Sequence, residues 1–371
     1  MSASASSSPP VDGPLALIMA GGTGGHVFPA LSVANALRAR GVPVVWLGTP
    51  GGMESRLVPE NGFPIEWVRV AGVRGKGLGT WLRAPFKLVQ AVLEARGVLS
   101  RVRPRAVLGA GGFVSGPGGI AAWLLGIPLL IHEQNAVAGM TNRWLARIAG
   151  QVLEAFPGSF GAGVAASCIG NPVREDIAAL PAPRLRFAAR RGRPRLLVLG
   201  GSQGAQRLNL IVPAALVGIL PPARPEVRHQ TGARGIDAAR SAYQTAGIEA
   251  ELLPFIDDMA GAYAWADLAI CRAGALTVTE LEAAGLGAVL VPFPAAVDDH
   301  QTKNAAVLVA RGAARIVQER DLTAESLGGL IAALTGDRAQ LLAMAEAARG
   351  AAVTDAAGRL ADLCIAAGEA A

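Results

Sequence analysis

Short apolar runs alternate along nearly the whole chain with longer stretches whose apolar residues recur at helical spacing. In the first half these runs predict strands at 15–20, 43–48, 64–70, 105–109, 128–132 and 151–155. A second series predicts strands near 194–200, 226–231, 249–254, 267–271, 288–292 and 314–317. Such alternation is typical of a doubly wound parallel sheet. The two series predict an α/β protein with two Rossmann-like doubly wound parallel-sheet domains facing across a cleft, with the ligand at the carboxyl ends of the strands.

Turn-forming residues separate the two series. Gly170-Asn171-Pro172-Val173-Arg174 interrupts the pattern, which predicts an N-terminal domain over 14–172 and a C-terminal domain over 173–350. A final helix, at about 351–371, could pack back on the first domain. Residues 1–13 are rich in serine, alanine and proline and lack a basic start and an apolar centre. They are therefore predicted to be a disordered tail rather than a signal peptide.

One uncharged stretch, 107–131, resembles a membrane span in composition. A spanning helix needs ~20 continuous apolar residues, but glycines interrupt the front of this stretch and Pro128 interrupts its rear. The pattern instead predicts a strand, a glycine loop, a helix over 118–126 and a further strand. No transmembrane helix is predicted.

The first predicted strand leads into Gly21-Gly22-Thr23-Gly24-Gly25-His26, and a helical pattern follows over 27–37. A glycine turn at a helix start lets backbone N–H groups approach an anion, and the helix dipole favours negative charge there. The dinucleotide fingerprint needs a third glycine, where this chain has Val27, and a carboxylate after the second strand, which instead ends in Gly48-Thr49. A nicotinamide or flavin is therefore disfavoured, and no cofactor is predicted.

The charge of the chain and its metal-binding residue types bear on whether it binds nucleic acid or a metal ion. The formal net charge is +6, but nearly all basic residues are arginine, so overall basicity says little about partners. The chain does not show the interleaved basic and aromatic residues that would suggest nucleic-acid binding, so no nucleic-acid partner is predicted. Three distant cysteines, four scattered histidines and the lack of a D-x-D motif predict no metal site.

One segment has a local excess of positive charge. Between Arg69 and Arg105, nine basic residues accompany a single acid, Glu94, and apolar side chains are interleaved with them. An ordinary surface helix with one core face explains this pattern, and so does a segment that contacts an anionic membrane surface.

The second half repeats the first motif and adds a polar cluster. Gly200-Gly201-Ser202-Gln203-Gly204-Ala205 again follows a strand. Further on, Thr277 and Glu280 lie three residues apart near a predicted helix start. This spacing fits a capping box, with Thr277 as N-cap, about as well as it fits ligand binding.

Six segments in order give the chain a family resemblance. It resembles the MurG family, the peptidoglycan N-acetylglucosaminyltransferases of the GT-B glycosyltransferase fold. The segments are Gly21 to Ala30, His132-Glu133-Gln134-Asn135, Gly170 to Arg174, Gly200 to Ala205, Phe255 to Met259 and Arg272 to Glu280.

The resemblance implies transfer of N-acetylglucosamine (GlcNAc) from UDP-GlcNAc to the C4 hydroxyl of the muramoyl sugar of lipid I. The transfer inverts the anomeric centre and gives lipid II for peptidoglycan synthesis. It also implies a peripheral location on the cytoplasmic side of the inner membrane. His26 is the implied catalytic base, with Glu133 as the competing base. The implied donor contacts are Thr23, Gly24, Gly25, Asn135, Arg174, Ser202, Ile256, Ala275, Leu276, Thr277, Val278, Thr279, Glu280 and Gln301.

Two other functions stay open at this point. A UDP-GlcNAc 2-epimerase shares the two-domain plan and the donor, and it would form UDP-ManNAc without an acceptor. A nucleotide-sugar binding module would bind UDP tightly without turnover.

Overall fold

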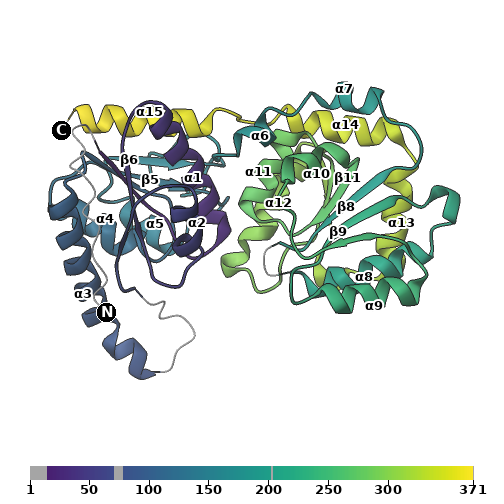
Figure 1. Cartoon of the computed structure of the whole chain (residues 1–371), viewed down its shortest axis with the longest axis horizontal. Coiled ribbons are helices and arrows are strands. Elements are labelled where there is room, and N and C mark those ends of the chain that lie inside the picture. The colour runs from purple at the N-terminus through teal and green to yellow at the C-terminus, as the bar shows by residue number, and fades with distance from the viewer. Residues whose placement is uncertain (1–14, 71–77, 202–203, 371) are drawn as a thin grey trace.

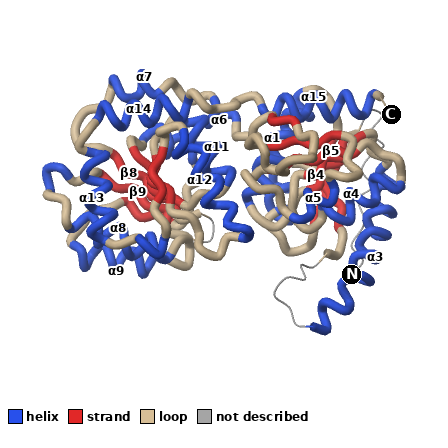
Figure 2. Tube along the Cα trace, turned by 180° about the vertical axis from the view of Figure 1, so that it is seen from behind, coloured by secondary structure: helices blue, strands red, loops and turns tan. Residues whose placement is uncertain are grey.

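A computed structural model describes residues 15–70, 78–201 and 204–370. It contains two parallel β-sheets side by side, each with helices packed around it (Figures 1 and 2). The sequence expectations for residues 1–13, Ser202, Arg74 and Lys76 lie outside the described residues. The side chains of 78–84, Trp81 among them, also lie outside the description.

The first sheet has the strand order β3-β2-β1-β4-β5-β6-β7, with every pair parallel. Its strands are β1 (Ala16–Met19), β2 (Val44–Gly48), β3 (Ile65–Trp67), β4 (Ala106–Gly109), β5 (Leu129–Glu133), β6 (Gln151–Glu154) and β7 (Ser167–Cys168). The helices of this half are α1 (Gly24–Ala39), α2 (Glu54–Glu60), α3 (Leu78–Val102), α4 (Ser115–Leu124) and α5 (Met140–Leu145).

The second sheet has the order β10-β9-β8-β11-β12-β13 and is also parallel throughout. Its strands are β8 (Arg195–Leu199), β9 (Glu226–Gln230), β10 (Glu251–Leu253), β11 (Leu268–Cys271), β12 (Ala288–Leu290) and β13 (Ala314–Ile316). The remaining α-helices are α6 (Glu175–Ala178), α7 (Pro183–Ala188), α8 (Gln206–Val217), α9 (Ile236–Ala246), α10 (Met259–Trp265), α11 (Ala275–Ala284), α12 (His300–Ala310), α13 (Ala324–Thr335), α14 (Arg338–Arg349) and α15 (Ala356–Glu369). Single 3-10 turns lie at Pro221–Ala223, Val297–Asp299 and Glu319–Asp321.

Both sheets reverse their strand order beside the first strand, between β1 and β4 and between β8 and β11. Ligands of doubly wound sheets bind outside the carboxyl ends of the strands at this switch point. The predicted α/β class with two doubly wound sheets is confirmed, and each predicted strand is observed with ends within three residues. The sequence did not predict β7, a strand of two exposed residues.

The strands form the centre of the core because helices cover both faces of each sheet. Leu17 and Ile18 are adjacent in β1 and therefore point to opposite faces, yet both are completely buried. This explains why the strands read as continuous apolar runs rather than as alternating patterns.

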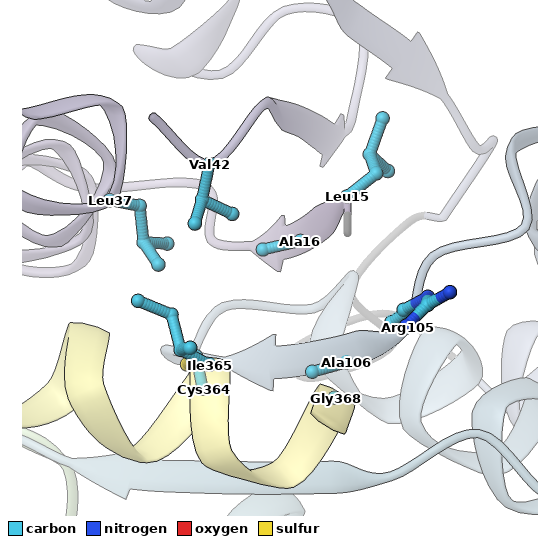
Figure 3. A pocket seen from close by; sticks show the side chains of 9 residues that line it. All are labelled: Leu15, Ala16, Leu37, Val42, Arg105, Ala106, Cys364, Ile365 and Gly368. Atoms are coloured by element: carbon cyan, nitrogen blue, oxygen red, sulfur yellow. The ribbon is translucent and has the colours of Figure 1, made fainter. Parts of the chain in front are cut away.

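The last helix, α15, packs against α1, β1 and β4 of the first sheet, at the other end of the molecule from α13 and α14 (Figure 1). Leu360, Ala361 and Cys364 are buried there, and Arg40 of α1 pairs with Asp362 at 2.7 Å. A small cavity remains between α15 and the strands, lined by Cys364 and its neighbours (Figure 3). Its volume is about 10 Å³, which holds no more than a water molecule.

Candidate active site

The candidate site lies where β1, β4 and β5 end. Helix α1 begins at Gly24, and its N-cap, Thr23, is an exposed residue with extended backbone. No side chain caps this helix in the part of the chain that the structure describes. The first backbone N–H groups of α1, including those of Gly24 and Gly25, therefore need other acceptors, such as water or an anionic ligand.

Two glycine loops pack directly against each other at this point. Gly111 and Gly112 follow β4 and have positive φ angles of +94° and +85°. A Cβ atom on Gly112 would collide with the backbone of Gly21, and one on Gly111 would collide with the ring of His26. Only glycine permits this approach, so the loop after β4 fixes both the turn after β1 and the His26 imidazole.

A buried carboxylate supports the first glycine loop from behind. Glu54, at the start of α2, is completely buried. It accepts hydrogen bonds from the N–H of Gly22 at 2.9 Å, the N–H of Thr49 at 3.1 Å and the Thr49 hydroxyl at 2.7 Å. These bonds join the loops that follow β1 and β2.

His26, in the first turn of α1, is half-buried and contacts a chain of buried polar groups. Its Nδ1 lies 3.1 Å from Oε1 of Gln134. Nε2 of Gln134 donates to the carbonyl of Ala110 at 2.8 Å and lies 3.4 Å from Nδ1 of His132. Nε2 of His132 lies 2.9 Å from the carbonyl of Gly170. Burial lowers the pKa of His132 to about 4, so this second imidazole is neutral at physiological pH.

Glu133, the alternative base, occupies a different kind of environment. Its carboxylate is buried and accepts four hydrogen bonds. Oε1 accepts from the backbone and side-chain amides of Asn135, at 2.9 and 3.1 Å, and Oε2 accepts from Gly139 N–H and Asn142 Nδ2, at 3.0 and 2.9 Å. A carboxylate with all these partners holds the loop after β5 in place.

Asn304 of α12 joins this loop to the second sheet. It is completely buried, and its Oδ1 accepts from Ala136 N–H at 2.8 Å. Its Nδ2 donates to Asn135 Oδ1 at 3.3 Å and to the carbonyl of Ala273, which follows β11, at 3.1 Å. The ends of β5 and β11 therefore meet at one amide side chain.

Glu280 lies inside α11, and the capping-box interpretation of the sequence is wrong. Helix α11 begins at Ala275 with Gly274 as N-cap, so Thr277 belongs to the helix itself. The buried carboxylate of Glu280 pairs with Arg174 at 3.1 Å and accepts from the Tyr263 hydroxyl at 2.9 Å. Burial raises the pKa of Glu280, and the Arg174 charge opposes this shift.

The other predicted donor contacts lie around the ends of the second sheet. Ile256 is buried after β10, and Gln301 of α12 accepts from Phe293 N–H at 2.9 Å. In the first turns of α11, Leu276 and Thr277 are half-buried. Among the predicted contacts in that helix, Ala275, Val278 and Thr279 are buried, as Glu280 is. Their roles as donor contacts are predictions, and Ser202 lies outside the described residues.

Sequence reasoning missed Glu54, Gln134 and Asn304, although Gln134 stood inside a quoted motif. All three are buried polar side chains, and each has a partner at least 32 residues away in sequence that only the fold reveals. Among the described residues, no group of three histidine, cysteine, aspartate or glutamate side chains could hold a metal ion. Within the same residues, no helix combines the length and the apolar character needed to cross a bilayer.

Comparison with known proteins defines the class first. Residues 16–154 match the glycosyltransferase family 28 N-terminal domain, and residues 195–360 match the glycosyltransferase family 28 C-terminal domain. Together these matches cover both parallel sheets except β7.

Full-length relatives define the family more closely. A Nitrosococcus oceani protein is 58% identical over 94% of this chain and 97% of its own length, and one from Marinobacter nauticus is 55% identical over 94% and 96%. Both are named UDP-N-acetylglucosamine–N-acetylmuramyl-(pentapeptide) pyrophosphoryl-undecaprenol N-acetylglucosamine transferase. The crystal structure of Acinetobacter baumannii MurG is 44% identical with a TM-score of 0.83, over 95% of this chain and all of that one. The chain therefore belongs to the MurG family of glycosyltransferases.

Proposed function

We propose that this protein transfers GlcNAc from UDP-GlcNAc to the C4 hydroxyl of the N-acetylmuramoyl sugar of lipid I, with inversion, giving lipid II and UDP. The observation that carries the proposal is 58% identity, over 94% of the chain, to a relative named for this transfer. The comparisons give no support to the 2-epimerase alternative.

The reaction breaks the bond between C1 of GlcNAc and the β-phosphate oxygen, and the electron pair leaves with UDP. The C4 oxygen of the acceptor attacks C1 from the opposite face, and its proton passes to a general base. We assign this base to His26, because Glu133 already accepts four hydrogen bonds. General-base catalysis of this kind contributes about 10²- to 10⁴-fold.

The uncapped N-termini of α1 and α11 supply N–H groups and positive dipole ends near the switch points of the two sheets. Such groups stabilise a leaving diphosphate without moving during the reaction. On this proposal the donor lies against the second sheet, with Ile256 at the uracil, Gln301 at the sugar and α11 at the nucleotide. Asn135 and the loop of Thr23, Gly24 and Gly25 approach the transferred sugar from the first sheet.

A lipid-linked acceptor requires the protein to reach a membrane, and we propose that helices α3, α4 and α5 make this contact. These neighbouring helices expose large apolar side chains, although most of the protein's large apolar residues are buried. The exposed side chains are Phe86, Leu88, Val89 and Leu93 of α3, Trp123 and Leu124 of α4, and Met140 and Trp144 of α5. Exposed Lys87, Arg96, Arg143 and Arg147 accompany them and suit anionic head groups on the cytoplasmic face.

The decisive experiment incubates the purified chain with labelled UDP-GlcNAc and lipid I. We expect a labelled disaccharide-lipid with a β-linkage and one UDP released per transfer. The same incubation without lipid I is the control. Formation of UDP-ManNAc in that control, or tight UDP binding with no turnover in either reaction, would contradict the proposal.

A further inference from the structure

We propose that Gln134 is a positioning residue that fixes the tautomer of His26, placing the proton on Nδ1 and leaving Nε2 free to accept the proton of the acceptor hydroxyl. This inference rests on the proposed function, because it concerns the base of that reaction. It concerns a residue that touches His26 rather than the substrate.

The orientation of the Gln134 amide follows from its other neighbours. The backbone oxygen of Ala110, 2.8 Å away, can only accept a hydrogen bond, so the amide group that faces it must be the NH₂. The carbonyl oxygen of Gln134 therefore faces His26. The amide is 1% exposed, so water does not compete for either end.

His132 holds the same orientation from the other side. The carbonyl of Gly170, 2.9 Å from Nε2 of His132, can only accept, so this nitrogen carries the proton. Because buried His132 is neutral, with a pKa of about 4, its Nδ1 is an acceptor. That nitrogen lies 3.4 Å from Nε2 of Gln134. An acceptor at this position requires the NH₂ group of Gln134 to face it, and the Ala110 carbonyl requires the same orientation.

The orientation of the Gln134 amide determines the tautomer of His26 through the contact between Oε1 of Gln134 and Nδ1 of His26. Oε1 of Gln134 has no proton, so Nδ1 of His26, at 3.1 Å, must carry one to form a hydrogen bond. The other tautomer would place two lone pairs against each other beside a buried group, which disfavours it by about tenfold or more. Free histidine prefers the opposite tautomer, with the proton on Nε2, in which the substrate-facing nitrogen could not act as a base.

The loop after β4 packs against the same side of the His26 ring. Gly111 lies so close to the ring that a Cβ atom there would overlap Nδ1 and the neighbouring ring carbon. The imidazole is thus held against the loop after β4 with Nδ1 inward. Nε2 is the nitrogen left for the proton of the C4 hydroxyl when the oxygen bonds to C1 and UDP departs.

Two-bond ¹H–¹⁵N spectra of the full-length protein labelled at histidine test the tautomer directly. The chain has four histidines, and the spectrum of His26→Ala identifies the signals of His26. We expect a protonated Nδ1 and a bare Nε2 in the neutral wild type. Gln134→Met keeps the length but removes the acceptor, so its His26 signals should move toward the Nε2–H form. A wild-type spectrum of the Nε2–H form, or unchanged signals in Gln134→Met, would overturn the inference.

Turnover gives a second readout. We expect Gln134→Met to lower kcat by about tenfold with the donor KM nearly unchanged, and to cause no further loss in the His26→Ala background. Gln134→Glu retains an acceptor oxygen toward His26 and should keep the Nδ1–H form, although its stability should fall because it loses the NH₂ that donates to the carbonyl of Ala110. Thr335→Val, which removes a buried 2.7 Å hydrogen bond within α13, is the control for general destabilisation. An equal loss from Gln134→Met in both backgrounds would show that Gln134 does not act through His26.

The failure of this inference is distinguishable from failure of the proposed function. If His26→Ala retains its turnover, the assigned base is wrong, and the spectra still report the tautomer. If His26→Ala is inactive but Gln134→Met changes neither the spectrum nor kcat, the positioning role of Gln134 is contradicted and the assignment of His26 as the base is kept. Should Gln134→Met fail to fold, the wild-type spectrum and Gln134→Glu still decide.

Discussion

The guanidinium of Arg174 lies 3.1 Å from the carboxylate of Glu280 and 5.8 Å from the ring of Phe28. Arg174 follows the first sheet in sequence, Glu280 belongs to α11, and Phe28 belongs to α1. One side chain thus contacts helices that begin at the switch points of both sheets. Tyr263 donates to the second oxygen of Glu280, so each carboxylate oxygen has one protein partner and can accept a further hydrogen bond.

Glu280→Gln should affect both stability and donor binding. The amide can accept from only one of the two donors, so we expect a loss of about 1–3 kcal/mol in the free energy of unfolding. If Glu280 also contacts the ribose, UDP-GlcNAc binding should weaken at least tenfold, about 1.4 kcal/mol. The 2′,3′-dideoxy donor is the control and should bind both proteins alike. A variant that distinguishes the two donors as well as wild type does would show that the ribose is held elsewhere.

His26→Ala should lower kcat by about 10²-fold or more, as expected for loss of a general base. Donor affinity, measured by calorimetry with UDP-GlcNAc, should change little. The matched variant is Asn35→Ala, an exposed position on the same helix. Turnover near the wild-type level in His26→Ala would transfer the role of the base to another group.

Gly112→Ala should abolish turnover and destabilise the protein. The new methyl group would collide with the backbone of Gly21 and displace the glycine turn at the start of α1. Gly126→Ala is the matched control, because Gly126 also has a positive φ, +69°, but has open space around its Cβ position. It should cost only the backbone strain of about 1–2 kcal/mol. Equal effects in thermal unfolding and turnover would show that the loop contact is unimportant.

Replacing Phe86, Trp123 and Trp144 together by serine should weaken binding to vesicles containing anionic lipid by at least tenfold, about 1.4 kcal/mol. Their side chains are 79%, 54% and 64% exposed, so folding should be little affected. Leu185→Ser/Leu220→Ser removes exposed apolar groups from the half of the chain that holds the second sheet and should bind like wild type. Flotation assays measure the binding, and equal flotation of all three proteins would contradict the proposed membrane contact.

Glu282 should make stability depend on pH. Burial raises its pKa from 4.5 to about 7, although the Arg311 charge and its 2.7 Å hydrogen bond oppose the shift. Between these values the native state holds a proton that the unfolded state has released. The stability that this bound proton gives the native state is fully present below pH 4.5 and is lost as the pH rises through 7. The melting temperature of wild type relative to Glu282→Gln should therefore fall between pH 5 and pH 8, and a constant difference would contradict this.

The sheets could be predicted because strands buried on both faces leave continuous apolar runs in the sequence. The exception, β7, consists of Ser167 and Cys168 at an exposed edge, where no apolar run is required. For the candidate site, the sequence motifs could predict which loops at the ends of strands form it, but not the contacts that its side chains make. Spacing could suggest that Thr277 and Glu280 form a cap, but the helix starts at Ala275, with Gly274 as an N-cap in extended conformation.

The partners of buried polar groups could not be predicted at all. His26 and Gln134 are 108 residues apart in sequence, and Ala136 and Asn304 are 168 apart. Such pairs depend on how two strand ends approach each other. No local pattern records that approach, so the sequence could name His26 as the base and Glu133 as its competitor but could not show the four hydrogen bonds that the Glu133 carboxylate accepts.

The return of α15 to the first sheet sets an order of events during synthesis on the ribosome. The apolar face of α1 is covered by Leu360, Ala361 and Cys364, which follow β6 by more than 200 residues, because β6 ends at Glu154. At a synthesis rate of about 5–20 residues per second, the apolar face of α1 stays uncovered for roughly ten seconds or more after β6 has been synthesised. The core around the first sheet is thus begun before the second sheet is synthesised and completed only afterwards, when the second sheet has had time to fold.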